Sequence, residues 1–323
     1  MPRNIILVLS DVHYASPAEQ VRTHHETRYI ANPILRIALK LYRHYIWLRD
    51  PLGQNHLLDR FLDAAPSEPL AVVANGDFSC DTAFVGVSDD AARESVELCL
   101  QKLRSRFGSG LRTVIGDHEL GKISMFGNVG GLRLASWSRV QELGFVPFWQ
   151  KKVGSWRLIG ITSSLVALPV YEPETLRSER AAWNELRSAH WQQIRTAFDE
   201  IRPDEKVILF CHDPSALPFL GREPAIRRRL DQIEATIIGH LHSPLLLWKS
   251  RWLAGMPAIG FLGNTVRRLT TALRDAREWR QFKVTLCPSL AGLELLKDGG
   301  YLTLELDSPT PNRLAIRRFH LPR

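Results

Sequence analysis

The chain alternates short apolar runs with longer amphipathic stretches. The runs are rich in Ile, Val and Leu, are four or five residues long and end in turn residues, which is typical of buried strands. Five of them follow one another along the sequence: Ile5–Leu9, Leu70–Val73, Leu111–Ile115, Lys206–Phe210 and Ala235–Ile238. Further strands are predicted at Trp156–Ser163, Tyr301–Leu306 and Leu314–Phe319, and the apolar spacing in Glu179–Ile201 predicts a helix. Strands that alternate with helices indicate an α/β fold.

A turn that carries Asp or His follows each of the five strands. In chain order, these side chains are Asp11, His13, Asp77, Asp117, His118, Glu119, His212, His240 and His242. In open α/β sheets the ligand crevice lies outside the carboxyl ends of the strands. We therefore expect the five turns to converge on one site.

Seven of these side chains are carboxylates and imidazoles of the kind that bind metal ions. They are Asp11, His13, Asp77, Asp117, His212, His240 and His242. Because a tetrahedral ion needs only four ligands, seven donors predict two ions. Imidazole suits zinc or iron, whereas carboxylate suits harder ions such as manganese. Two ions about 3.5–4 Å apart, with a shared carboxylate and a bridging hydroxide as the nucleophile, are the arrangement of binuclear hydrolases.

The ordered series resembles the calcineurin-like metallophosphoesterase superfamily. Four motifs and a single histidine carry the resemblance: D-x-H at 11–13, G-D at 76–77, G-D-H-E at 116–119, His212, and G-H-x-H at 239–242. The resemblance covers residues 5 to about 245. It implies a four-layer αββα sandwich and two divalent or mixed-valence ions of manganese, iron or zinc.

The resemblance also implies a role for each side chain. Asp11, His13, Asp77 and His242 would hold the first ion, and Asp77, Asp117, His212 and His240 the second, so that Asp77 bridges the two. His118 would contact the substrate phosphate and protonate the leaving oxygen, and Glu119 would orient His118.

The sequence departs from the family pattern in two motifs. Asp117 stands where the family usually has Asn, and this adds a negative charge to the site unless Asp117 is protonated or bound to a neighbouring cation. The second motif usually has an acid three residues after its Asp, where this chain has Cys80 followed by Asp81. Ile115 replaces an Arg that the Ser/Thr protein phosphatases carry, so we do not interpret the chain as a protein phosphatase.

Composition fits one globular domain over residues 1–323, with a helical insertion at about 15–65. The 323 residues are 45% hydrophobic and 24% charged, as in ordinary globular proteins. Within the insertion, Asn32-Pro33 is an N-cap signal and Ile34–Leu48 has a helical pattern, with a second short helix predicted at about His56–Leu62.

The N-terminus has no secretory apolar region and no run is long enough to span a membrane, so we expect a cytoplasmic protein with reduced cysteines.

The charge balance bears on the partner. Lys and Arg number 42 against 34 Asp and Glu, and the net charge of +8 favours an anionic partner. Two stretches are basic, Ile34–Leu48 and the predicted helix Val266–Lys283. We interpret the protein as a phosphoesterase that acts on a phosphomonoester, phosphodiester or pyrophosphate. Three alternatives stay open: a nuclease-like enzyme, a lipid-headgroup pyrophosphohydrolase and a non-catalytic scaffold. A nucleic acid or an anionic membrane surface is a possible partner.

Overall fold

Two five-stranded sheets stack face to face in the computed structural model, which describes residues 4–257, 264–307 and 313–322. The first sheet has the order β10 (Leu314–His320), β9 (Gly300–Leu306), β1 (Ile5–Leu9), β2 (Ala71–Asn75) and β3 (Leu111–Val114). β1, β2 and β3 are parallel, whereas β9 pairs antiparallel with both β1 and β10. The first strand of the chain therefore lies in the middle of this sheet.

The second sheet is built in the same manner from the middle of the chain. Its order is β4 (Phe148–Val153), β5 (Trp156–Ile161), β6 (Lys206–Cys211), β7 (Ile233–Ile238) and β8 (Val284–Leu286). β4 and β5 form an antiparallel hairpin, and β5 to β8 are parallel. Each sheet thus has a parallel part whose carboxyl ends can present side chains to a common site.

The two sheets share one apolar core. Alternate residues of the central strands, among them Val8, Val73, Leu158, Ile208 and Phe210, belong to a single buried cluster. The remaining residues of the same strands, such as Leu7 and Leu209, belong to a second cluster with the helices. Because successive side chains of a strand point to opposite faces, both faces of each sheet are covered.

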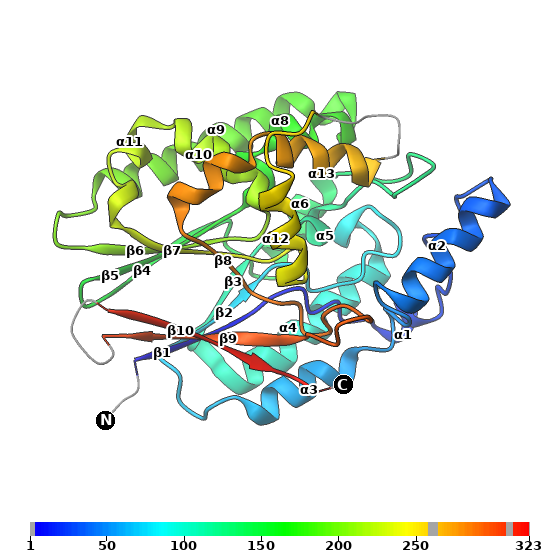
Figure 1. Ribbon diagram of the computed structural model, residues 1–323, viewed down its shortest axis with the longest axis horizontal. Helices are drawn as coiled ribbons and strands as arrows, with labels where there is room; N and C mark the ends of the chain where they lie inside the picture. The colour runs from blue at the N-terminus through cyan, green and yellow to red at the C-terminus, as the bar shows by residue number, and fades with distance from the viewer. Residues whose placement is uncertain (1–3, 258–263, 308–312, 323) are drawn as a thin grey trace.

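Helices form the two outer layers (Figure 1). α3 (Asn55–Ala64) and α4 (Asp90–Phe107) lie below the first sheet, and α9 (Arg180–Asp199), α10 (Leu217–Arg222) and α11 (Pro224–Arg227) lie above the second. The other helices are α1 (Pro17–Gln20), α2 (Pro33–Tyr45), α5 (Asp117–Leu120), α6 (Leu134–Glu142), α7 (Ser163–Val166), α8 (Leu168–Tyr171), α12 (Pro244–Trp252) and α13 (Asn264–Arg274). The predicted four-layer αββα sandwich is confirmed.

All strands expected from the apolar runs are present, within two residues at each end. The apolar runs did not predict β4 and β8, the edge strands of the second sheet. β4 contains three consecutive polar residues, Gln150, Lys151 and Lys152, and β8 is only three residues long, so neither gives a continuous apolar run.

The expected helix Val266–Lys283 is interrupted. α13 ends at Arg274, and a 3₁₀ helix, η7 (Ala276–Phe282), follows it. Leu273, Ala276, Trp279 and Phe282 are all buried. Their spacing of three residues matches the three residues per turn of a 3₁₀ helix rather than the 3.6 of an α-helix. Packing of this row therefore selects the tighter helix.

Three helices, α1, α2 and α3, lie where the insertion is expected. The Asn32 side chain accepts hydrogen bonds from the backbone N–H groups of Ile34 and Leu35 at 2.9 and 3.2 Å, which confirms the predicted N-cap of α2. α2 ends at Tyr45, three residues earlier than expected, and the following Leu48 turns inward and is buried.

Two further observations concern the chain as a whole. None of the helices in the described ranges combines the length and apolar character that crossing a membrane requires. All four cysteines are buried and unpaired.

Candidate metal centre

The turns that follow β1, β2, β3, β6 and β7 meet at one end of the sandwich, as the sequence predicts. Side chains from these turns form two groups whose potential ligand atoms lie within 4.8 Å of one another in each group. One group is Asp11, His13 and His242, and the other is Asp77, Asp117, His212 and His240. All seven predicted donors are thus brought together, and they come from both sheets.

The backbone at these positions has an unusual conformation. Asp11, His13, Asp77, His240 and His242 all have positive φ, between 49° and 59°. Residues other than glycine adopt this left-handed region rarely, although Asp and His do so more often than most. The left-handed turn directs the side chains inward, where a regular strand would continue outward. Strained residues of this kind cluster at functional sites.

Distances within the cluster are those between ligands of a common ion. Nε2 of His212 lies 3.1 Å from Oδ2 of Asp77, and Nδ1 of His240 lies 3.3 Å from Oδ1 of Asp117. In the other group, Nε2 of His242 lies 3.4 Å from Oδ1 of Asp11. Two atoms that are each about 2.0–2.2 Å from one ion are separated by roughly 3–3.5 Å. The two groups therefore have the spacing of two coordination shells.

Several donor atoms have no partner among the described residues. Nε2 of His13, Nε2 of His212 and Oδ1 of Asp117 are buried and accept no hydrogen bond. Buried polar atoms are almost always paired, so such orphans in one cluster indicate that a ligand is needed. The other ring nitrogens are paired: Nδ1 of His212 lies 2.6 Å from the Asn75 carbonyl oxygen and Nδ1 of His13 lies 3.2 Å from that of Ser79.

These carbonyl contacts fix the histidine tautomers. A backbone carbonyl can only accept, so Nδ1 of His13 and of His212 must carry the proton and donate it. The lone pair then lies on Nε2, which faces the cluster. Support of a ligand ring by an outer hydrogen bond is common at metal sites. The residues present therefore fit two metal ions.

Asp77 lies between the two groups. It belongs to the group with Asp117, and it also forms a third group of potential ligands with His13 and His118. Burial opposes its ionisation, but the charges of His118 and His212 hold the pKa of Asp77 well below its usual range. The preceding Gly76 has a φ of +90°, and a side chain there would collide with the His212 ring. Asp77 is thus a buried carboxylate at the centre of the cluster.

Glu119 has a different part from the one expected. Its carboxylate accepts hydrogen bonds from the backbone N–H groups of Gly116, Asp77 and Phe78, at 2.8, 3.0 and 2.7 Å. Burial raises the pKa of Glu119 to about 8, and the negative charge of Asp77 adds to the effect. Glu119 therefore clamps the turn of Asp77 to the turn after β3. The expected orientation of His118 by Glu119 is not what these contacts show.

His118 is oriented by the backbone instead. Its Nδ1 lies 2.9 Å from the Ser79 carbonyl oxygen, so Nδ1 donates and Nε2 faces the cluster, 3.7 Å from Oδ2 of Asp77. The Nζ of Lys122, which lies four residues further along the chain and just past the end of α5, contacts this Nε2. Burial lowers the pKa of His118 well below that of a free imidazole, and Lys122 is a further cause. A neutral ring beside a lysine is the result.

Asp117 forms an ion pair with Arg268. Nη2 of Arg268 lies 2.6 Å from Oδ2 of Asp117, on the side opposite the orphaned Oδ1. Nη1 of Arg268 reaches the buried carboxylate of Glu174 at 3.5 Å, and its guanidinium lies over the Tyr171 ring. Burial opposes the ionisation of Asp117, but the charges of His240 and Arg268 hold its pKa well below the usual range. The negative charge that Asp117 adds in place of the usual Asn is therefore paired with the positive charge of Arg268.

The second departure has a structural explanation. The Asp81 carboxylate is buried and accepts hydrogen bonds from the backbone N–H groups of Val85, Gly86 and Lys122. It therefore ties the 81–86 loop to the segment that carries Lys122. Cys80 is buried beside it, and its Sγ contacts the His13 carbonyl oxygen at 3.1 Å.

Lys122 and Arg268 were not among the predicted site residues. Lys122 lies four residues after His118 but beyond the end of α5 at Leu120, so only its nearness in the sequence could have suggested it. Arg268 is 151 residues from Asp117 in the sequence, and no local pattern connects them.

The chain matches one family model and is similar to several solved structures. The family model described as calcineurin-like phosphoesterase matches residues 5–244, a stretch that includes all seven donors and His118. Among solved structures, a dimetal phosphatase from Danio rerio is 13% identical, with a TM-score of 0.47 and coverage of 100% of this chain and 98% of that chain. A conserved uncharacterized protein from Streptococcus pneumoniae, described as a predicted phosphoesterase, is 12% identical, with a TM-score of 0.27 and coverage of 98% and 99%. No curated protein sequence matches the chain.

We expect Arg268→Gln to destabilise the metal-free protein by on the order of 3 kcal/mol at pH 7, because it leaves a buried carboxylate without its cation. The double variant Asp117→Asn/Arg268→Gln should recover at least half of that loss. Pairing lowers the pKa of Asp117 in the folded state, so its contribution is present above the unfolded pKa and is lost as the pH falls through the folded pKa. The cost of Arg268→Gln should therefore persist from pH 7 down to about pH 4, the pKa of an Asp in an unfolded chain, and should shrink only below it.

Urea unfolding after chelation of metals measures these differences. Arg267→Gln is the matched control, since Arg267 lies on the same helix and pairs with Glu174 at 2.8 Å. The effects of Arg267→Gln and Asp117→Asn on the free energy of unfolding should be additive. Additive effects for Arg268→Gln and Asp117→Asn would show that the pair contributes nothing.

Proposed function

The chain belongs to the calcineurin-like phosphoesterase family, and from this premise we propose that the cluster at the strand ends is the active site of a binuclear phosphoesterase. The family makes the protein a metal-dependent phosphoric ester hydrolase. One observation carries the more specific proposal: Asp77 groups with Asp117, His212 and His240 on one side and with His13, itself grouped with Asp11 and His242, on the other. A phosphorylated substrate follows from the family, and its phosphate is a monoester, diester or pyrophosphate.

The donor sets assign each side chain to an ion. Asp11, His13 and His242 would hold the first ion, Asp117, His212 and His240 would hold the second, and Asp77 would be shared between the two. Two ions held in this manner supply an activated water and neutralise charge on the phosphate. Manganese, iron and zinc all suit mixed carboxylate and imidazole ligands.

His118 acts on the leaving group in this proposal. Its Nε2 faces the cluster while Nδ1 is held by the Ser79 carbonyl, so only Nε2 can exchange a proton with substrate. An anionic phosphoester beside the ring favours its protonated form, which offsets the effect of burial. His118 then donates the Nε2 proton to the oxygen that departs. Lys122 contacts the same nitrogen in the structure. When substrate binds, its phosphate would replace His118 as the contact of Lys122.

The non-catalytic alternative is not favoured by the site. A scaffold that has kept only the fold is expected to lose donors, whereas all seven converge here with unpaired atoms facing inward. The conformation at the strand ends is also costly to retain without a function.

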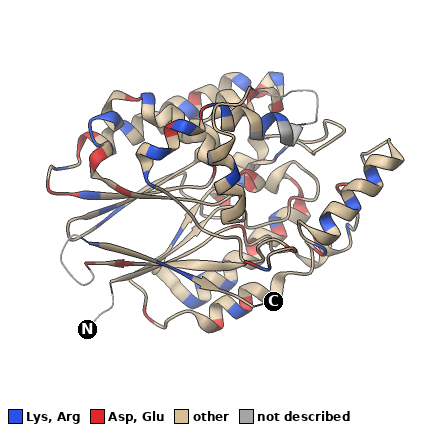
Figure 2. Ribbon diagram, in the orientation of Figure 1, with Lys and Arg blue, Asp and Glu red and all other residues tan. Residues whose placement is uncertain are grey.

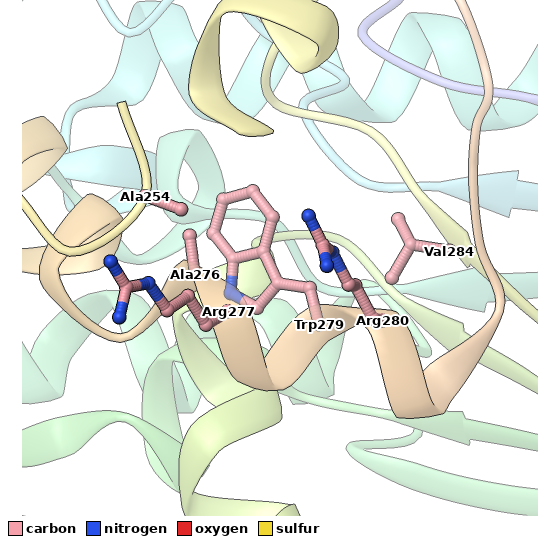
Figure 3. A pocket seen from close by; sticks show the side chains of 6 residues that line it. All are labelled: Ala254, Ala276, Arg277, Trp279, Arg280 and Val284. Atoms are coloured by element: carbon pink, nitrogen blue, oxygen red, sulfur yellow. The ribbon is translucent and has the colours of Figure 1, made fainter. Parts of the chain in front are cut away.

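The nuclease-like alternative has less support from the structure than from the charge. Arg267 and Arg268 of the basic 266–283 stretch turn toward Glu174 and Asp117. Figure 3 shows Trp279 between Arg277 and Arg280 on η7, at a pocket of about 20 Å³, which has room for little more than a water molecule. Elsewhere Lys and Arg are spread over helices of both outer layers (Figure 2). A duplex requires a continuous basic surface.

The first experiment is metal analysis coupled to a substrate panel. Protein purified with its metals should contain two ions per chain and should hydrolyse phosphomonoesters, phosphodiesters or pyrophosphates. Chelation should abolish the activity, and Mn²⁺ should restore it. Activity that survives complete metal removal would contradict the proposal.

Asp77→Asn should lower the metal content at both positions, because a shared carboxylate belongs to two coordination shells. His13→Ala is the matched control and should lower the content by about one ion, since His13 contacts one group of the pair. Metal per chain after dialysis, measured by mass spectrometry, separates the two results. Two ions retained in Asp77→Asn would rule out the shared position.

His118→Ala should lower kcat by about 10²–10⁴, the usual range for loss of general acid catalysis, while both ions remain bound. The defect should be smaller for nitrophenyl esters, because nitrophenolate departs with little need for a proton. His44→Ala, at an exposed position on α2, is the control and should leave both metal content and kcat unchanged. Loss of metal in His118→Ala would assign the ring to coordination instead.

A further inference from the structure

The metal centre opens into a cavity of about 290 Å³ with walls of two kinds. Asp77, Asp117, His118, His240 and His242 line one part. The size is close to the lower end of pockets that hold small organic ligands, about 300 Å³. The cavity therefore has room for much more than a phosphate group.

Apolar side chains from separate elements line the other part. Leu39 and Tyr42 come from α2, Leu246 from α12 and Ala272 from α13, with Trp47 and Met125 contributed by loops. These residues lie far apart in the sequence, so the apolar wall is a product of the fold. The helices and loops that form this wall all lie outside the two sheets.

The apolar wall begins directly at the metal centre. The Trp47 ring centroid lies 4.9 Å from that of His242, a predicted ligand, and 6.3 Å from that of Tyr42. A row of rings thus leads from the cluster to α2. A substrate whose phosphate is at the metals must place its next atoms against this row or against Lys122.

Among the described residues, three cations line the cavity, and each has a partner. Lys122 contacts His118 and Arg268 pairs with Asp117 at 2.6 Å, so both lie beside the metal donors. Arg43 pairs with Glu26 at 2.7 Å. The wall of Leu39, Tyr42, Leu246 and Ala272 offers contacts to hydrocarbon.

Exposed apolar residues are concentrated on the same two helices. On α2 and its C-terminal end, Ile34, Ile37, Leu41, Tyr45 and Ile46 are each at least 40% exposed. On α12 and its end, Trp248, Trp252 and Leu253 are at least 49% exposed. Single exposed apolar residues are ordinary, but a concentration of them marks a binding region. Both helices border the cavity.

We propose that the substrate is an amphiphile, a phosphoester attached to a long hydrocarbon chain that lies along the Leu39, Tyr42, Leu246 and Ala272 wall. The inference rests on the proposed function, because the metal centre must receive the phosphate. Each methylene buried against such a wall contributes about 0.8 kcal/mol, or up to about fourfold in affinity. The exposed apolar faces of α2 and α12 extend the same surface beyond the cavity for a chain longer than the cavity.

The test compares methyl-, hexyl- and decylphosphonate, which share a headgroup that is not hydrolysed. Calorimetric titration of the Mn²⁺-loaded protein, below the micellar concentration of the ligands, should show affinity that rises at least about tenfold from hexyl to decyl. Equal affinities for the three phosphonates would overturn the proposal. Phenylphosphonate that binds as tightly as decylphosphonate would also overturn it, since a compact ring would then be the occupant.

Two variants locate the chain. Ala272→Trp and Leu246→Ser should each lower the ratio of decyl to methyl affinity, because one fills the apolar part and the other makes it polar. Val146→Ser, at an exposed apolar position outside the cavity lining, is the control and should leave that ratio unchanged. An unchanged ratio in Ala272→Trp and Leu246→Ser would place the chain elsewhere and contradict the proposal.

Hydrolysis is measured separately on 4-nitrophenyl phosphate and bis(4-nitrophenyl) phosphate, which have no long chain. Hydrolysis without dependence on chain length would refute the amphiphile and leave the proposed function intact. Dependence on chain length without hydrolysis of any ester would refute the proposed function and leave the ligand class standing.

Discussion

Three buried carboxylates in one small cluster impose the main constraint on this structure. Asp11, Asp77 and Asp117 are each at most 2% exposed, and charges taken out of water must be paired to remain ionised. The imidazoles of His212 and His240 lie against these carboxylates, and Arg268 pairs with Asp117. Two metal ions, which the cluster fits, would complete the compensation. The architecture around the cluster can be understood as the means of holding these charges together.

The sandwich holds these charges together with two kinds of structure, regular strands and strained residues at the strand ends. Continuous strands with apolar faces fix where each turn begins, and the left-handed residues at the strand ends then direct the donors inward. Glu119 joins two of the turns through three backbone hydrogen bonds. Packing energy of the sheets thus supports a local conformation that the turns alone would not adopt.

The sequence predicted the elements that depend on local patterns. Central strands, the N-cap of α2 and the convergence of the seven donors all follow from apolar runs and from residues adjacent to them. The role of Glu119 and the pairing of Asp117 with Arg268 depended instead on which backbone groups or distant helices lie nearby. The break after Arg274 was missed because a row of apolar residues was read with helical spacing, although its period of three indicates a 3₁₀ helix. Contacts between distant segments leave no such local trace.

The position of β1 has a consequence for synthesis of the chain. β1 pairs with β2 on one side and with β9 on the other, so that Ile6 lies opposite both Ala71 and Leu304. A ribosome must therefore translate past residue 300 before the second edge of β1 finds its partner. An unpaired strand edge is a template for association with other chains, and a nascent chain carries this edge until residues 300–306 have emerged. Chaperone binding during translation should concentrate on the fragment that contains Ile5–Leu9 and lacks residues 300–306.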